Sequence, residues 1–111
     1  MQHGLSNSAD NWFLNGEDGS QGFHLVNRGF DVWAGNNRGN KYSKEHTNPD
    51  INKKDFFAYS FHELAWYDVP AHYKTILSNY SDNTKIVYIG HSQGTSQIFA
   101  SMSKHSPNRE Y

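Results

Sequence analysis

The apolar residues of this chain gather in a few short stretches between long polar ones, and these stretches predict its secondary structure. Residues 86–89 form a continuous β-branched and aromatic run, which is typical of a strand buried on both faces in a parallel sheet. A shorter strand is expected at residues 30–34. It should end at the stretch 35–40, because glycine and asparagine tolerate positive φ and break regular structure.

A longer helix is predicted over residues 61–79, where apolar residues recur near one face. Ser60 and Glu63 have the spacing of a capping box, in which each side chain accepts a hydrogen bond from the backbone of the other. Pro70 removes one helical hydrogen bond, so a kink or a break is expected there.

The N-terminal part is mostly polar. Residues 5–22 are predicted to form a loop, with Trp12, Phe13 and Leu14 as its apolar anchor. A short helix is expected at residues 22–27 and should end before Gly29. A second polar loop extends to about residue 54.

The order helix, turn, strand, glycine-rich turn, helix toward the C-terminus predicts an α/β fold. Only 35% of the 111 residues are hydrophobic, although 15% are aromatic. A domain of this length should bury roughly two-thirds of its unfolded surface. We therefore expect the chain to lack the apolar residues for a full core of its own.

Charge and composition exclude several classes of partner. The formal net charge is −1 and the basic residues are scattered, whereas phosphate binding requires clustered lysine and arginine. No apolar run approaches the roughly 20 residues of a membrane helix. Without cysteine there is no disulfide framework, and no histidine spacing typical of a metal site occurs. We expect neither nucleic acid nor a metal as partner, and no transmembrane segment.

The strongest chemical signal is the pattern Gly-x-Ser-x-Gly of residues 90–94, which we call the elbow. A chain that leaves a strand and enters a helix within a few residues must turn sharply. This turn places Ser92 in a strained conformation that costs on the order of 1–3 kcal/mol. Gly90 and Gly94 have no Cβ and let the helix lie close to the strand. The Ser92 hydroxyl is then exposed as a nucleophile, and the Gln93 amide can donate to the oxyanion formed at an ester carbonyl.

A second oxyanion donor is expected from His3-Gly4-Leu5, because hydrolases with this elbow take one from a loop after an earlier strand. Leu5 would supply a backbone N–H, and Gly4 would let the loop approach the substrate. His91 neighbours Ser92 in sequence but is interpreted as an elbow residue and not as the general base. The remaining histidines, and Asp31 and Asp68, are interpreted as structural.

These residues belong to a wider resemblance. The chain resembles the acid lipases, the family of gastric lipase and lysosomal acid lipase, along nearly its whole length. The resemblance is carried by residues 2–5, Asn11-Trp12, 29–40, Tyr42-Ser43, Phe61 with Glu63, 67–71 and 88–95. One departure is Asn37, where members of the family carry serine.

The resemblance implies hydrolysis of triacylglycerols or steryl esters at a lipid–water interface. It implies Ser92 as the nucleophile, the amides of Leu5 and Gln93 as the oxyanion hole, and no cofactor. It also implies a secreted or lysosomal protein, although residues 1–4 show no signal peptide. Asn79-Tyr80-Ser81 is an acceptor pattern for glycosylation.

Length is the main departure from this family, whose members are several times longer. The triad order of the fold is Ser, then Asp or Glu, then His, but His105 and Glu110 follow Ser92 too soon and in the wrong order. In that family the strand that ends at His3 lies between the strands at residues 30–34 and 86–89. Here it is reduced to its tip, which leaves unpaired strand edges. We therefore interpret residues 1–111 as part of a single α/β-hydrolase domain, and predict that the isolated chain is poorly folded or inactive.

Two alternatives remain open. One is a non-catalytic truncated hydrolase that keeps the elbow for packing or for binding lipid or a partner. The other is a different α/β-hydrolase, such as a peptidase or acyltransferase, because the elbow is shared by all of these. A downstream Asp and His in a longer reading frame would favour the lipase.

Overall fold

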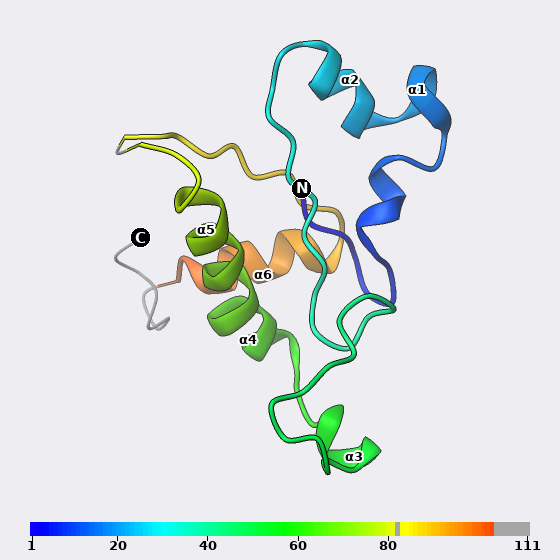
Figure 1. Ribbon diagram of the computed structural model, residues 1–111, viewed down its shortest axis with the longest axis vertical. Coiled ribbons are helices and arrows are strands. Elements are labelled where there is room, and N and C mark those ends of the chain that lie inside the picture. Colours follow the sequence, from blue (N-terminus) through cyan, green and yellow to red (C-terminus); the bar gives the residue numbers. More distant parts are fainter. Residues whose placement is uncertain (82, 104–111) are drawn as a thin grey trace.

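The computed structural model describes residues 1–81 and 83–103. The helical elements of this part are η1 (Ala9–Trp12), α1 (Gly16–Gly19), α2 (Gln21–Asn27), α3 (Lys53–Phe56), α4 (Phe61–Glu63), η2 (Leu64–Asp68), α5 (Val69–Leu77) and α6 (Gln93–Ser101). Element η1 is a 3₁₀-helix and η2 is a π-helix. Figure 1 shows α4 and α5 running along one side of the molecule next to α6, with α1 and α2 apart from them.

Three extended segments meet in parallel at Gln2. Its amide donates to the carbonyl of Ile89 (2.8 Å), and its carbonyl accepts from the amide of His91 (3.0 Å). On the other side, the Gly35 amide donates to the Met1 carbonyl (3.0 Å). Gln2 thus forms parallel bridges to both Gly35 and Gly90 and lies between them. This is the neighbour order that the resemblance implied for the tip of the central strand.

The predicted strands themselves are not confirmed. Parallel pairing in the described residues is limited to the two bridges at Gln2, and residues 30–34 and 86–89 are otherwise extended without a ladder. The expectation that residues 86–89 are buried on both faces is wrong, since Val87 is 71% exposed. The reason is that, among the described residues, only Met1 and Gln2 lie between the two segments, so the rest of each segment is not paired there.

The N-terminal region is more helical than the sequence indicated. The predicted loop 5–22 contains η1 and α1. Trp12 is buried as expected, but Leu14 is exposed, so the anchor is smaller than predicted. Helix α2 is confirmed, and Gly29 follows it with φ +85°, a conformation that favours glycine. Helix α3 in the second polar loop was missed, although the Asn52 side chain caps it by accepting from the Asp55 amide (3.0 Å).

The predicted helix 61–79 is confirmed as the continuous succession α4, η2 and α5. The capping box forms, because the Ser60 amide donates to Glu63 Oε2 (2.7 Å) and the Ser60 hydroxyl accepts from the His62 amide. The break expected at Pro70 takes the form of the π turn η2, in which the Val69 amide donates to the Leu64 carbonyl five residues back. A proline ring collides with the carbonyl four residues earlier in an α-helix, and a wider turn relieves that collision.

The small core lies where η2 and α5 contact α6. Its buried apolar side chains there are Leu64, Ala65, Val69 and Ile98. The chain exposes 7917 Å² of surface, whereas a compact protein of its mass exposes about 6,200 Å². The excess of exposed surface agrees with the small number of apolar residues in the sequence.

Candidate active site

The backbone reverses direction at Ser92. This residue has φ +51° and ψ −119°, lies directly before α6, and is one of few non-glycine residues in the described chain with positive φ. A serine in this region is strained by on the order of 1–3 kcal/mol and persists only where its surroundings hold it. Ser92 is nevertheless exposed. The sharp turn and the exposed position both agree with the sequence-based expectation.

The elbow glycines are required by close backbone contacts. A Cβ on Gly94 would lie 2.5 Å from the carbonyl oxygen of Gln2 and 2.8 Å from that of His3. A Cβ on Gly90 would lie 2.7 Å from the amide nitrogen of Thr95. The first turn of α6 therefore packs directly on the backbone at Gln2 and His3, as the spacing of the glycines predicted.

Two side-chain hydrogen bonds fasten the turn to the start of α6. The Thr95 hydroxyl donates to the Gly90 carbonyl (2.8 Å), and the Tyr88 hydroxyl donates to the Gly94 carbonyl (2.8 Å). Burial raises the pKa of Tyr88, so this phenol remains a donor at neutral pH. Both bonds connect the segment before the elbow with the helix after it.

A buried network of side-chain amides connects α6 to the residues packed against it. This network was not predicted from the sequence. Gln2 Nε2 and Gln97 Nε2 donate to Asn37 Oδ1 (3.0 and 3.1 Å), and Asn37 Nδ2 donates to Gln97 Oε1 (3.1 Å). Gln97 is fully buried. The signal in the sequence was a glutamine beside Ile98, on the helix face that turns inward. Asn37, the one residue named as a departure from the family's serine, is the centre of this network.

The two expected oxyanion donors lie on one cavity. Leu5 and Gln93 both line a hollow of about 650 Å³, together with Gly4. Within residues 1–81 and 83–103, neither the Leu5 amide nor the Gln93 amide donates to a protein acceptor. A Cβ added to Gly4 would lie 3.2 Å from Ser92 Cβ, so the loop after His3 runs directly beside the serine. An oxyanion hole requires such unpaired N–H groups beside the nucleophile, and Ser92 itself is not among the residues that line this hollow.

No general base is found beside Ser92 in the described part of the chain. His91 is exposed and turns to Gly4, with Nδ1 3.1 Å from the position of an added Cβ. His24, His46 and His62 are exposed, and His72 is half-buried, where burial lowers its pKa. None of them accepts a hydrogen bond from the Ser92 hydroxyl. His105 and Glu110 lie outside the described residues.

The two aspartates interpreted as structural have structural partners. Asp68 is buried and accepts from both the backbone amide (2.9 Å) and the guanidinium Nε (2.7 Å) of Arg38. It thereby fixes the loop 36–40 to η2. Asp31 accepts from the Tyr80 hydroxyl. Among the described residues no cluster of metal-binding side chains is found, and no helix is both long and apolar enough to span a membrane.

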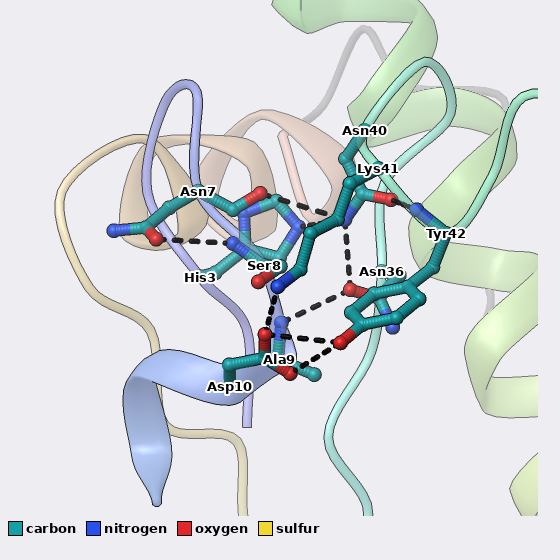
Figure 2. A network of polar contacts seen from close by, with 9 residues as sticks. All are labelled: His3, Asn7, Ser8, Ala9, Asp10, Asn36, Asn40, Lys41 and Tyr42. Atoms are coloured by element: carbon teal, nitrogen blue, oxygen red, sulfur yellow. Dashed lines mark hydrogen bonds and ion pairs between the residues drawn. The ribbon is translucent and has the colours of Figure 1, made fainter. Parts of the chain in front are cut away.

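The site joins segments that lie far apart in the sequence. Figure 2 shows the loop after His3 tied to the loop at Asn36 through Asn40, whose Nδ2 donates to Asn36 Oδ1 (2.7 Å) and to the Asn7 carbonyl (3.4 Å). Lys41 and Tyr42 both contact the carboxylate of Asp10. Two polar loops are therefore held together around the buried His3.

This geometry agrees with comparison to known proteins. A model of the alpha/beta hydrolase fold family matches residues 1–109. The chain belongs to the α/β-hydrolase fold family. Its α/β class is thereby established, although the described residues contain only the two bridges of the family's parallel sheet.

Similar proteins within this family are lipases. The chain is 42% identical over 104 residues to human lysosomal acid lipase/cholesteryl ester hydrolase, covering 94% of this chain and 26% of that protein. It is 44% identical over 103 residues to bovine gastric triacylglycerol lipase, covering 93% and 26%. Human lipase member M is also 44% identical over 103 residues, covering 93% and 24%. The resemblance to acid lipases is confirmed, and the chain spans about a quarter of the length of these relatives.

Proposed function

We propose that this chain carries the nucleophile and oxyanion hole of a serine hydrolase that acts on lipid esters. The observation that supports the proposal is the strained, exposed Ser92 at the start of α6, beside two backbone amides without a protein acceptor. The names of the relatives supply the substrate class, since they include a triacylglycerol lipase and a cholesteryl ester hydrolase.

The proposed reaction has two halves. The Ser92 oxygen attacks the ester carbonyl, and the amides of Leu5 and Gln93 donate to the oxyanion of the tetrahedral intermediate. The C–O bond to the alcohol breaks, the alcohol leaves with the serine proton, and an acyl-serine remains. Water then attacks this acyl group and releases the fatty acid. The start of α6, with its positive dipole end, also favours the negative charge.

A base must take the proton of Ser92 for this reaction to proceed at a useful rate, because a hydroxyl of ordinary pKa is a weak nucleophile. No histidine bonded to Ser92 is found in the described residues, so we propose that the acid and base of the triad belong to further parts of the hydrolase domain. The isolated 111-residue chain should accordingly be inactive. We propose a secreted or lysosomal location as well, supported by the words lysosomal and gastric in the names of the same relatives.

A chimera tests this proposal. The matched segment of bovine gastric triacylglycerol lipase is replaced by this chain, and hydrolysis of a short-chain triacylglycerol is measured. The chimera should hydrolyse the ester and react stoichiometrically with a fluorophosphonate at Ser92. Ser92→Ala should abolish both, whereas Ser96→Ala, an exposed serine one turn further along α6, should retain both.

Two results would contradict the proposal. Hydrolysis by the Ser92→Ala chimera at the rate of its parent would show that another group is the nucleophile. Stoichiometric labelling of Ser92 in the isolated chain would show that a base is already present, and would overturn the expected inactivity.

A further inference from the structure

The His3 side chain is buried, only 3% exposed, and makes polar contacts with both ring nitrogens. The Asn37 backbone amide donates to Nε2 (3.1 Å), and Nδ1 lies 2.7 Å from the Gly4 carbonyl oxygen. A backbone N–H can only donate, so Nε2 is the acceptor. In a neutral imidazole the other nitrogen then carries the proton. Nδ1–H therefore donates to the Gly4 carbonyl.

This bond controls the direction of the next amide. The Gly4 carbonyl and the Leu5 N–H belong to one planar trans peptide and point in opposite directions. The Gly4 oxygen also accepts from the Asn7 amide (3.3 Å). Two donors thus hold the oxygen toward the protein, and the Leu5 N–H must point the other way. Gly4 lies beside Ser92, because a Cβ built on Gly4 would lie 3.2 Å from Ser92 Cβ.

The ring that sets this direction is itself held in place. Asn40 Nδ2 lies 3.3 Å from His3 Nε2 and donates to Asn36 Oδ1 (2.7 Å). Figure 2 shows His3 and Asn40 in one network with Asn7 and Asn36. Since the imidazole is buried and its Nε2 is occupied, it cannot rotate without breaking bonds to the loop 36–40.

We propose that His3 is a positioning residue for the oxyanion hole. Its Nδ1–H fixes the Gly4–Leu5 peptide so that the Leu5 N–H faces the carbonyl oxygen of an ester attacked by Ser92. The inference rests on the proposed function for its catalytic meaning. The orientation of the peptide, however, can be measured without any reaction.

Two variants of His3 test its two hydrogen bonds, to Gly4 and to Asn37, one at a time. In His3→Asn, the amide Nδ2 occupies the place of imidazole Nδ1 and can still donate to the Gly4 carbonyl. In His3→Gln, the side-chain oxygen reaches the place of Nε2 and can still accept from Asn37, but no donor reaches Gly4. Each variant therefore loses one buried hydrogen bond and keeps the other, so a purely structural role should affect both alike.

The readout is nuclear magnetic resonance of the full ¹⁵N-labelled chain. In the wild type, the ring nitrogens of His3 should report a proton on Nδ1, and the Leu5 amide proton should show a nuclear Overhauser contact to the Ser92 β-protons. The contact should persist in His3→Asn and be lost in His3→Gln. A proton on Nε2 in the wild type, or the same contact in all three proteins, would overturn the proposal. An undispersed wild-type spectrum would show the isolated chain to be poorly folded, as the sequence predicts, and the kcat comparison of the two variants in the chimera would then decide the proposal.

The same variants in the chimera distinguish this proposal from the proposed function. His3→Gln should lower kcat about 10²–10³-fold, the usual effect of losing one oxyanion donor, and leave KM nearly unchanged. His3→Asn should restore most of that loss. A parent chimera without esterase activity, together with the predicted resonance pattern, would refute the lipase assignment and leave the positioning role intact. Equal kcat values for both variants would refute the positioning role alone.

Discussion

The two longer extended segments, residues 30–35 and 86–91, differ between their two ends. At their carboxyl ends, residues 30–35 are hydrogen-bonded to Met1 and residues 86–91 to Gln2, and the start of α6 packs on that junction without space for a Cβ. Toward their amino ends Phe30 and Val87 are exposed, and neither segment has a strand partner in the described residues. The site edge is therefore held by a few close backbone contacts, whereas the amino ends of both segments are unpaired among the described residues.

The largest effect should come from Gly94→Ala. Its new Cβ would lie 2.5 Å from the Gln2 carbonyl, which is backbone and cannot move aside cheaply. We expect α6 to separate from the junction at a cost of about 3 kcal/mol, the upper end for overpacking. Urea denaturation followed by circular dichroism measures the loss. Ser96→Ala on the exposed side of the same helix is the control. An unchanged midpoint for Gly94→Ala would show that the close contact is not formed.

Asn37→Ala should have the next largest effect. It leaves the amides of Gln2 and Gln97 buried without their shared partner, and an unsatisfied buried polar group costs about 1–3 kcal/mol. The melting temperature should fall clearly in this variant and hardly at all in Asn27→Ala, an exposed position on α2. Equal melting temperatures would mean that the network contributes nothing to stability.

Two valines, one buried in the core and one exposed in an unpaired segment, allow the two regions to be compared by the same substitution. Val69 is 1% exposed beneath α6, and Val87 is 71% exposed in the unpaired segment. Val→Thr keeps the shape and adds a hydroxyl, which should cost about 1–3 kcal/mol at Val69 but less than about 0.5 kcal/mol at Val87. Chemical denaturation gives both values. A cost at Val87 as large as at Val69 would show that residues 86–89 are buried after all.

The smallest effect is expected on the way the free energy of unfolding changes as the pH falls. Burial lowers the pKa of His72 in the folded chain, below the ordinary value of about 6.5 that applies to the unfolded chain. As pH falls below that value, the unfolded chain takes up a proton that the folded chain resists, so the free energy of unfolding decreases. His72→Phe should flatten this decrease, measured by urea midpoints between about pH 7.5 and 5. A steeper decrease in the variant would contradict the sign of the shift.

Several elements could be predicted from the sequence because their signals are local. The capping box at Ser60 and Glu63 and the stop at Gly29 depend on neighbouring residues alone, and both are found as expected. The elbow is of the same kind, since the spacing of its glycines is dictated by how closely a helix can approach a strand. Helix α3 was missed although its Asn52 cap is also local, because a run of charged residues gave no apolar period.

The sequence by itself determined the turn at Ser92, its two glycines, the helical stretch around Pro70, and the family. Tertiary structure alone decided that the Asn37 side chain meets Gln97, and that the Asn37 amide meets the His3 ring. It also decided that residues 86–89 are not enclosed. The physical reason is distance along the sequence: helix caps and turns are set by residues a few positions apart. A buried hydrogen bond or a covered strand instead depends on partners brought from 30 to 60 positions away.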